Sequence, residues 1–269
     1  METLQVLTEF YSNYDEDGRL LSKHGRVEYL TTMRYIQKYL QPGMRILEVG
    51  AATGRYSHAL AQMGYRVDAV ELVQHNIDIF LEKTQHGENV SIRQGDARDL
   101  SAFAENTFDI TLVLGPMYHL FTEEDQKQAL REAIRVTKPG GFVFAAYCGN
   151  EATMVQYCFG RGMIREQRYR DLIDPVTFKA SSDPAELFEL YRKEDIDALV
   201  EDFPVTRLHY VGTDMATNYM RSVVDEMDDE MFDLYLQYHF ATCERSDCVG
   251  TSYHILDVFR KENSLAQWK

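Results

Sequence analysis

Hydrophobic and polar residues recur along this chain with two different periods. Short apolar runs typical of buried strands cover residues 44–49, 67–71, 90–95, 108–114, 142–147, 205–211 and 254–260. Between these runs, apolar residues recur at the spacing of an amphipathic helix, as Tyr56, Ala59, Leu60 and Met63 do. Strands that alternate with helices form a parallel sheet whose two faces are covered by helices. The pattern therefore predicts an α/β fold built on seven strands.

The same pattern predicts one domain with helical additions. Two helices are expected within residues 1–41, and the sheet is expected to be built from residues 42–149 and 191–262. Residues 150–190 contain no long strand-like run and residues 213–247 have helical spacing, so both segments are expected to be insertions. The first insertion follows the end of a strand. Because ligands bind at the carboxyl ends of strands in an open α/β sheet, we expect it to form a cap beside a pocket.

The stretch 44–55 (MRILEVGAATGR) predicts a strand, a tight turn and the start of a helix. Gly50 and Gly54 bound the turn, and glycine allows positive φ angles and the close approach of a ligand to the backbone. The helix that follows presents free N–H groups and the positive end of its dipole. We therefore expect a ligand with an anionic group at this turn.

The glycines of this turn do not match the fingerprint of a dinucleotide site. Counted from Gly50, the second and third glycines of G-x-G-x-x-G are replaced by Ala52 and Arg55. This disfavours an oxidoreductase that binds a nicotinamide or flavin cofactor. No Gly-Lys-Ser/Thr follows the turn, which excludes a P-loop.

An acidic residue ends the second predicted strand. Glu71 follows the turn by about 20 residues, the spacing at which an acidic side chain meets ribose hydroxyls in nucleotide-binding folds. A carboxylate suits a ribose because it can accept a hydrogen bond from each hydroxyl of the diol. The turn and Glu71 together predict a ligand that contains a ribose.

Composition narrows the range of partners. The chain has 269 residues and a formal net charge of −15, and an acidic surface repels nucleic acid. No apolar run approaches the roughly 20 residues that span a bilayer, and the N-terminus lacks the features of a signal peptide. The four cysteines have no zinc-ligand spacing and fit reduced thiols in a cytosol. We therefore expect a cytoplasmic protein with no metal, nucleic-acid or membrane partner.

Several motifs follow one another in a fixed order between residues 44 and 147. They are residues 48–54 (EVGAATG), Glu71, residues 95–97 (GDA), residues 108–109 (FD) and residues 138–141 (KPGG). In this order they resemble the motifs of class I S-adenosylmethionine-dependent methyltransferases, of the small-molecule type related to the ubiquinone and menaquinone biosynthesis enzymes. The first motif has Ala52 where that family often has glycine. The resemblance implies a Rossmann-like, mostly parallel sheet whose last strand is antiparallel and inserted beside the fifth.

The resemblance also implies S-adenosyl-L-methionine as the cofactor, with S-adenosyl-L-homocysteine as its product. Glu48 and Gly50 would border the amino-acid end of the cofactor, and Glu71 would hold its ribose. Asp96 would accept a hydrogen bond from the adenine amino group, beside the backbone N–H of Ala97. The full set implied for the cofactor is Glu48, Gly50, Ala51, Ala52, Gly54, Glu71, Leu72, Asp96, Ala97 and Leu114.

The residues that would contact the acceptor are less closely tied to motifs. N-terminal segments of relatives often fold over the cofactor, which implies a lid or substrate role for Tyr11, Tyr14 and Arg26; core packing and surface exposure are equal alternatives. Tyr118 and Tyr147 lie near strand ends and could shape a substrate pocket. His119 titrates in the range of a general base, with packing under the cap as its alternative. The histidines without motif support, which we expect to be structural, are His24, His209, His239 and His254.

The resemblance leaves two functions open. The first is an enzyme of class EC 2.1.1 that transfers a methyl group from S-adenosylmethionine to a small-molecule acceptor, which we expect to be neutral or cationic and partly aromatic. The alternative is a regulatory or partner protein that binds S-adenosylmethionine without transferase activity of its own.

Overall fold

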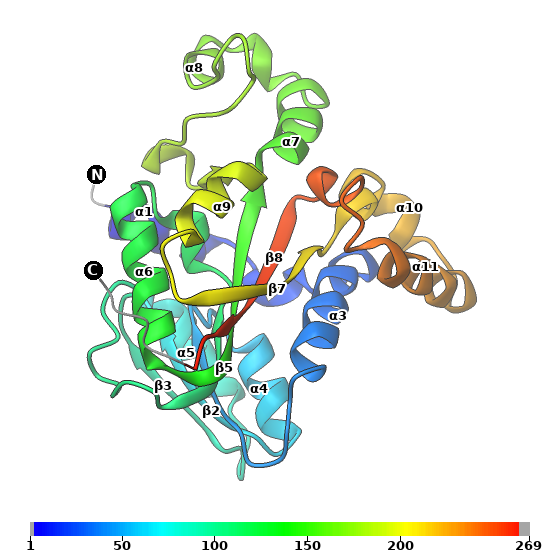
Figure 1. The fold of residues 1–269 in the computed structure, drawn as a ribbon. Helices are drawn as coiled ribbons and strands as arrows, with labels where there is room; N and C mark the ends of the chain where they lie inside the picture. Colours follow the sequence, from blue (N-terminus) through cyan, green and yellow to red (C-terminus); the bar gives the residue numbers. More distant parts are fainter. Residues whose placement is uncertain (1–2, 264–269) are drawn as a thin grey trace.

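A mixed sheet forms the centre of the protein, which we describe from a computed structural model over residues 3–263. Its strands lie in the order β3-β2-β1-β4-β5-β8-β7, and the short β6 pairs with the end of β5 (Figure 1). The strands are β1 (Arg45–Val49), β2 (Arg66–Glu71), β3 (Val90–Gln94), β4 (Phe108–Val113), β5 (Thr137–Gly149), β6 (Leu190–Tyr191), β7 (Val205–Gly212) and β8 (His254–Lys261). Strands β1 to β5 are parallel, whereas β8 is antiparallel to both β5 and β7. This confirms the implied topology, including the antiparallel last strand beside the fifth.

The central strands were predictable because both of their faces are buried. In β1, the side chains of Ile46, Leu47 and Val49 are at most 1% exposed, and such strands appear in the sequence as continuous apolar runs. The start of the fifth strand differs from the prediction. Residues 138–141 were expected to lie before that strand, yet β5 begins at Thr137 and includes them. The register between β4 and β5 shifts in this region, which accommodates the glycines inside the strand.

Helices cover both faces of the sheet (Figure 1). They are α3 (Lys23–Gln37), α4 (Arg55–Gln62), α5 (Gln74–Lys83), α6 (Glu123–Val136) and α9 (Lys193–Val200). α6 and α9 pack on one face, in a cluster that contains Ile134 and Leu199. α3 and α4 pack on the other face through Ile36 and Leu60, and α5 joins them through Phe80.

Helix α6 illustrates how the sequence determines such an element. The hydroxyl oxygen of Thr122 caps its first turn by accepting a hydrogen bond of 3.2 Å from the N–H of Asp125. Acidic residues fill that first turn, where they complement the positive end of the helix dipole. The apolar positions Leu130, Ala133 and Ile134 form the buried stripe that the spacing predicts.

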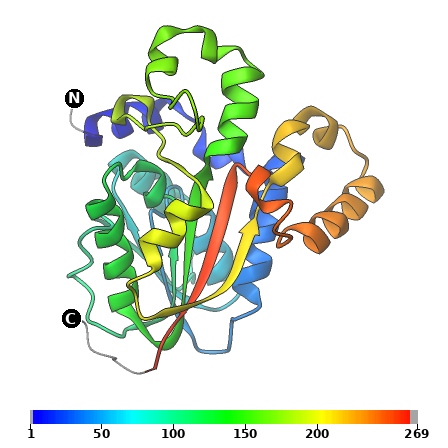
Figure 2. The same ribbon diagram turned by 45° about the horizontal axis from the view of Figure 1, so that its top comes forward.

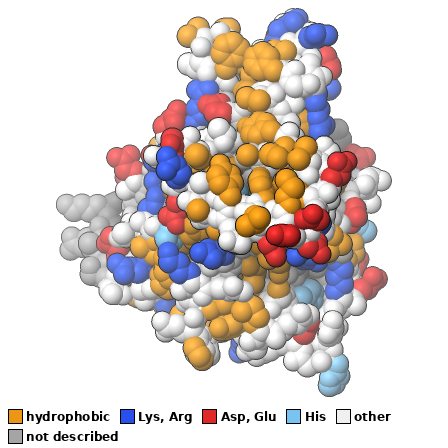
Figure 3. Space-filling model, turned by 90° about the vertical axis from the view of Figure 1, so that its right-hand side faces the viewer, with side chains coloured by type: hydrophobic (Ala, Val, Ile, Leu, Met, Phe, Trp, Pro, Cys, Tyr) orange, Lys and Arg blue, Asp and Glu red, His pale blue; other side chains and the backbone are white. Residues whose placement is uncertain are grey.

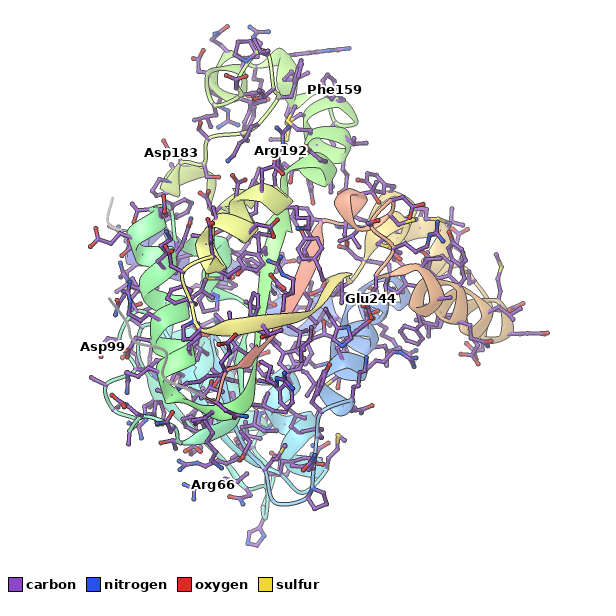
Figure 4. All side chains as sticks on the ribbon, viewed as in Figure 1. Arg66, Asp99, Phe159, Asp183, Arg192 and Glu244 are labelled. Carbon is purple, nitrogen blue, oxygen red and sulfur yellow. The ribbon has the colours of Figure 1, made fainter. Side chains whose placement is uncertain are left out.

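A group of short helices stands on the carboxyl end of β5 (Figure 1, Figure 2). It contains α7 (Asn150–Thr153), the π-helical η2 (Met154–Phe159), η3 (Met163–Arg165), α8 (Gln167–Asp171) and η4 (Pro184–Glu186). Arg192 joins this group to α9, because its Nε lies 2.6 Å from Glu151 Oε1 and its Nη2 donates to the carbonyl of Thr177 at 2.7 Å. Figure 4 shows Arg192 at this junction and Phe159 farther out, where its side chain is exposed.

A second group of helices lies between β7 and β8 in the sequence and packs on α3. It consists of η5 (Met215–Tyr219), α10 (Arg221–Asp225), α11 (Asp229–Thr242) and η6 (Val249–Thr251). Val27 of α3, Val224 and Phe232 form its small apolar core. Figure 3 shows hydrophobic side chains gathered on this side of the molecule. The exposed apolar residues of this group include Val223, Met231, Leu234 and Tyr238.

The N-terminal helices lie across the same end of the sheet as the first group (Figure 2). α1 (Thr3–Asn13) packs through Leu7 against Val73 and Leu187. α1 ends at Asn13, and the next residues form a further helical turn, α2 (Glu16–Arg19), which the Asp15 side chain caps.

Three further features of the described residues limit the chemistry of the fold. No helix within residues 3–263 is long and apolar enough to cross a membrane. All four cysteines are free thiols. Over the same residues, no cluster of three or more histidine, cysteine or acidic side chains is arranged to hold a metal ion.

Candidate functional site

A cavity of about 840 Å³ lies at the carboxyl ends of the parallel strands, between the sheet and the N-terminal helices. Its walls contain most of the residues predicted for the site. These are Tyr11, Tyr14, Glu48, Gly50, Ala51, Ala52, Glu71, Leu72, Asp96, Ala97, Leu114, Tyr118 and His119. Strands β1, β2, β3 and β4 each end at this cavity, so the topology of the sheet brings the sequence motifs together.

The turn between β1 and α4 requires its glycines for two different reasons. Gly50 has a φ of +74°, and a Cβ atom there would lie 2.5 Å from the ring of Pro116. Gly54 has a φ of +87° and is the N-cap of α4, where a Cβ atom would lie 2.5 Å from Phe80. Gly50 therefore allows the turn to approach Pro116 in the loop after β4, whereas Gly54 allows it to pack against Phe80 of α5.

Ala52 adopts a backbone conformation that favours glycine. Its φ is +46°, in the left-handed region where a Cβ atom is strained. Its N–H donates a hydrogen bond of 2.9 Å to Oε2 of Glu71. Glu71, at the end of β2, therefore stabilises the conformation of the turn between β1 and α4 that lines the cavity.

Glu71 is a buried carboxylate held by backbone donors. Besides the N–H of Ala52, it accepts the N–H of Val73 at 2.9 Å and the side-chain amide of Asn76 at 3.4 Å. Burial raises the pKa of Glu71 above its usual value, although these hydrogen bonds act in the opposite direction. Both oxygens retain lone pairs that can accept hydrogen bonds from a ligand.

Glu48 is the least solvated acidic residue of the predicted site. It is 2% exposed, and its carboxyl group accepts a hydrogen bond from the hydroxyl of Ser57 on α4. Burial raises the pKa of Glu48 to about 8, so the group is mostly protonated at neutral pH. A cationic ligand group beside it would favour the ionised form.

Asp96 lies half-buried after β3 at the rim of the cavity. Its carboxylate accepts hydrogen bonds from the backbone N–H of Arg98 at 2.9 Å and from the guanidinium of the same residue. Burial alone would raise the pKa of Asp96, but the hydrogen bonds and charge of Arg98 hold it below its usual value. Asp96 is therefore an ionised acceptor.

Tyr11 and His119 both line the cavity and contact each other. The phenol oxygen of Tyr11 lies 2.9 Å from Nε2 of His119, and Nδ1 of His119 lies 2.8 Å from the carbonyl oxygen of Leu187. Both ring nitrogens are thus engaged by the protein. Burial lowers the pKa of His119 to about 4, so the ring is neutral at neutral pH.

Three predicted residues lie outside the cavity wall. Gly54 is behind the first turn. Arg26 is exposed on α3, with its guanidinium 5.4 Å from the centre of the Phe232 ring, so it lies on the outer surface rather than in a lid. Tyr147 is fully buried with its ring 5.0 Å from Tyr191, on the face of the sheet that α6 covers. Because side chains alternate along a strand, Tyr147 faces away from the cavity and is a core residue.

The cavity also contains a charged network that the sequence analysis missed. His254, which we expected to be structural, lines the cavity and contacts Asp214 at 2.9 Å and Glu28 at 3.2 Å through Nδ1. Arg19 in turn pairs with Glu28 at 2.7 Å and with Glu16 at 3.1 Å. These residues come from elements far apart in the sequence, so no local spacing connects them. One signal in the sequence could have indicated His254. The resemblance implied an antiparallel last strand beside β5, and such a strand begins at the carboxyl edge of the sheet, where the cavity lies.

Comparisons with known proteins agree with this geometry. The family described as "Methyltransferase domain" matches residues 46–141. A cypemycin N-terminal methyltransferase of Streptomyces sp is 35% identical over 128 residues, which are 44% of this chain and 51% of that relative. The chain thus spans about half of that relative's length.

Two longer matches extend the comparison beyond the motifs. A ubiquinone biosynthesis O-methyltransferase of Pseudomonas fluorescens is 28% identical over 191 residues, 68% of this chain and 79% of the relative. A solved structure from Thermotoga maritima, described as a SAM-dependent methyltransferase and possible histamine N-methyltransferase, covers 97% of this chain and 100% of its own. Its TM-score is 0.58 at 16% identity, a likeness that shows the fold.

The sheet order, the cavity and the matched domain define a class of protein, the Rossmann-like methyltransferases. The methyltransferase domain matched at residues 46–141 and the relatives above support a class I S-adenosylmethionine-dependent methyltransferase, and this domain and the fold imply S-adenosylmethionine as the cofactor. The residues present fit this cofactor. The cavity combines a backbone turn kept open by Gly50, a buried carboxylate with free lone pairs at Glu71 and a protonated acid at Glu48 that can meet an ammonium group.

Proposed function

We propose that this protein transfers a methyl group from S-adenosylmethionine to a small-molecule acceptor, an activity of class EC 2.1.1. One observation carries the proposal: the ends of β1, β2 and β3 bring Glu48, Glu71 and Asp96 to one cavity, in the strand order that the motifs imply. The cavity volume lies within the range of small-molecule sites.

The cofactor would lie along the ends of these strands. Glu71 would accept hydrogen bonds from the ribose hydroxyls with the lone pairs that Ala52 and Val73 leave free. Asp96 would accept from the adenine amino group, with the N–H of Ala97 beside the ring. Leu72 and Leu114 would line the adenine, and Glu48, Gly50 and Ala51 would border the amino-acid end.

When bound, S-adenosylmethionine supplies a methyl carbon on a sulfonium sulfur that leaves as a thioether. The protein's own residues then have three tasks: to hold the acceptor in line with that carbon, to exclude water and to accept a proton where the acceptor carries one. His119 was expected to accept the proton. Its Nε2 is engaged by Tyr11, so it could act only after that contact opens.

The acceptor side of the cavity is aromatic and acidic. Its aromatic residues include Phe10, Tyr11, Tyr14, Tyr118, Tyr157, Phe188 and Tyr253. Glu16, Glu28 and Asp214 add carboxyl groups, and Arg19 pairs with two of them. Aromatic faces and acidic side chains favour a neutral or cationic, partly aromatic acceptor.

The proposal includes the organisation of the chain. One methyltransferase domain would consist of a core at 42–149 and 191–262. Residues 1–41 were expected to be lid helices; α1 and α2 would have this role, whereas α3 packs on the sheet. Residues 1–2 lie outside the described part. Residues 150–190 and 213–247 would be insertions that close the acceptor side. The contact of Tyr11 with His119 and the presence of Tyr157 and Phe188 in the cavity wall support these roles.

Calorimetric titration with S-adenosylmethionine and S-adenosylhomocysteine tests the cofactor, and an acceptor screen that follows S-adenosylhomocysteine release tests the transfer. We expect micromolar binding of both compounds and turnover of an aromatic hydroxyl or amine compound. Binding without turnover across the screen would favour the regulatory or partner role. Binding of NADH in place of S-adenosylmethionine would overturn the proposal.

A further inference from the structure

His254 is the first residue of β8, and the direction of that strand brings it to the cavity. β8 runs antiparallel to β5, and His254 pairs in register with Cys148 near the carboxyl end of β5. The carbonyl of His254 also accepts the N–H of Thr213, which follows β7, at 2.9 Å. Backbone contacts on both sides therefore fix the position from which the imidazole faces the cavity.

The environment of Nδ1 determines which nitrogen of His254 carries the proton. Oδ2 of Asp214 lies 2.9 Å from Nδ1, and Oε2 of Glu28 lies 3.2 Å from the same atom. Carboxylate oxygens only accept hydrogen bonds, so Nδ1 is protonated. In the neutral ring the lone pair is therefore on Nε2, for which residues 3–263 provide no hydrogen-bond partner.

Asp214 is held in place firmly enough to orient the ring. It is 6% exposed, and its Oδ1 accepts hydrogen bonds from the hydroxyl of Ser252 at 2.7 Å and the N–H of Tyr253 at 2.8 Å. Burial alone would raise the pKa of Asp214, but hydrogen bonds and charge from His254 and Ser252 hold it below its usual value. Asp214 is thus an ionised, oriented partner of Nδ1.

Glu28 supplies a second carboxylate whose charge is partly balanced. Arg19 donates to Glu28 at 2.7 Å, so the Glu28 side chain is fixed between the guanidinium and the imidazole. A proton added to Nε2 would create an imidazolium with two carboxylates at its other nitrogen. Such neighbours stabilise the cation.

His119 offers the opposite environment. Its two nitrogens are engaged by Tyr11 and Leu187, and burial lowers its pKa to about 4. No carboxylate among the described residues contacts its ring.

The third histidine of the cavity wall, His24, also has both nitrogens engaged, because Nδ1 lies 2.7 Å from Asp225 Oδ2 and Nε2 lies 3.3 Å from Ser22 Oγ. Among the described residues of the cavity wall, only His254 combines an oriented Nδ1–H with an Nε2 free to accept a proton.

We propose that His254, oriented by Asp214, is the general base that deprotonates the acceptor. In this step the O–H bond of a hydroxyl acceptor, or an N–H bond of a protonated amine, breaks and the proton forms a bond to Nε2. The electron pair left on the acceptor oxygen or nitrogen would form the new bond to the methyl carbon, while the S–C bond breaks with its pair going to sulfur. The imidazolium then releases its proton to solvent. The acceptor is therefore a hydroxyl or amine compound, an inference that rests on the proposed function.

Charged and aromatic groups from several elements surround this base. Glu28 and Asp214 contact its Nδ1, and Arg19 pairs with Glu28 and Glu16 beside it. The rings of Tyr118 and Tyr253 lie 6.0 Å and 4.6 Å from the imidazole, and Cys148 pairs with His254 in the register of β5 and β8.

Nitrogen NMR of protein with labelled histidines and bound S-adenosylhomocysteine shows which nitrogen of His254 carries the proton. This tests the pairing of His254 with Asp214 without turnover. His254→Gln assigns the resonances. We expect the neutral ring to carry its proton on Nδ1 and to have an unprotonated Nε2. A neutral ring with its proton on Nε2 would overturn the proposal.

Turnover of two catechols provides the second test. Catechol needs a base at neutral pH, whereas the nitro group of 4-nitrocatechol favours its ionised form. We expect His254→Gln to lower kcat for catechol by about 100-fold or more and to affect 4-nitrocatechol much less. His86→Gln, at an exposed turn outside the cavity wall, is the matched control. Imidazole should restore part of the activity of His254→Ala.

The outcomes separate the two proposals. If the wild-type protein binds no S-adenosylmethionine, the proposed function fails. If it binds the cofactor and methylates catechol, and His254→Gln keeps its rate and its pH profile, only the role of His254 fails. If neither catechol is an acceptor, the position of the His254 ring proton measured by NMR alone decides whether His254 is the oriented, free base that the proposal requires.

Discussion

The phenol oxygen of Tyr11 lies 2.9 Å from Nε2 of His119, and this contact joins the first helix to the loop after β4. Nδ1 of His119 can only donate to the carbonyl of Leu187, so Nε2 accepts the hydrogen bond from the Tyr11 hydroxyl. α1 and the segment around η4 are thus fastened to one imidazole. Both segments line the cavity, so the contact ties the N-terminal helix to the rest of the cavity wall.

Replacement of Tyr11 by phenylalanine should let the N-terminal helix separate from the rest of the cavity wall more often. The variant loses one hydrogen bond worth about 1 kcal/mol, so we expect roughly fivefold faster dissociation of S-adenosylhomocysteine and faster proteolysis near residues 14–22. Stopped-flow fluorescence and limited proteolysis measure the two effects. Tyr14→Phe is the control, because the Tyr14 hydroxyl makes no hydrogen bond among the described residues. Equal effects of both variants would show that the contact does not act as a clamp.

The sequence predicted the sheet and the residues that line the cavity at its edge because both depend on local patterns. The central strands are continuous apolar runs, and Glu48, Glu71 and Asp96 lie near the carboxyl ends of β1, β2 and β3. The face on which a strand residue lies is harder to predict, because a shift of one position reverses it. Tyr147 illustrates this: it points into the core, whereas its neighbour Cys148 belongs to the opposite cluster.

The charged network around His254 could not be read from spacing. Its members come from α2, α3, the loop after β7 and the start of β8, and they meet only because β8 lies between β5 and β7. The family topology places the start of β8 at the cavity edge but does not identify its partners. Glu28 and Asp214 appear in the sequence as ordinary acids, and only their distances to His254 distinguish them.

Glu71 should determine much of the cofactor affinity. Glu71→Gln keeps the size of the side chain but removes the charge that accepts hydrogen bonds from the ribose. Since hydrogen bonds to charged groups contribute about 1.5–3 kcal/mol, we expect S-adenosylhomocysteine to bind about 10- to 100-fold more weakly by calorimetry. Asp78→Asn, which changes an exposed acid on α5, should leave the affinity unchanged. An unaltered affinity in Glu71→Gln would refute the ribose assignment.

The positive φ of Ala52 should cost stability that glycine recovers. Ala52→Gly relieves about 1–2 kcal/mol of backbone strain, partly offset by the greater entropy of glycine in the unfolded chain. We expect a net gain of about 0.5–1 kcal/mol, or an increase of about 1–4 °C in Tm for a chain of this size. Ala59→Gly, in the middle of α4, should lower Tm instead. A decrease in both variants would mean that the turn does not strain Ala52.

Glu48 should make the protein less stable as the pH rises. Burial raises its pKa to about 8 from 4.5, so between these values the native state binds more protons than the unfolded state. The free energy of unfolding then falls with pH, by at most about 1.4 kcal/mol per unit from this group. Glu48→Gln removes this contribution, so urea unfolding at about pH 5, 6.5 and 8 should give a flatter profile than the wild type. Glu82→Gln, at an exposed position of α5, should keep the wild-type slope.

The same carboxyl group should report on the cofactor. If the ammonium group of S-adenosylmethionine lies beside Glu48, it favours the ionised carboxylate, and binding near pH 7 must release the proton that Glu48 carries in the free protein. Calorimetry in two buffers with different ionisation enthalpies measures this proton. We expect release approaching one proton for the wild type and close to none for Glu48→Gln. The wild type and Glu48→Gln differ only in this carboxyl group. Equal proton release by both proteins would therefore place the ammonium group away from Glu48.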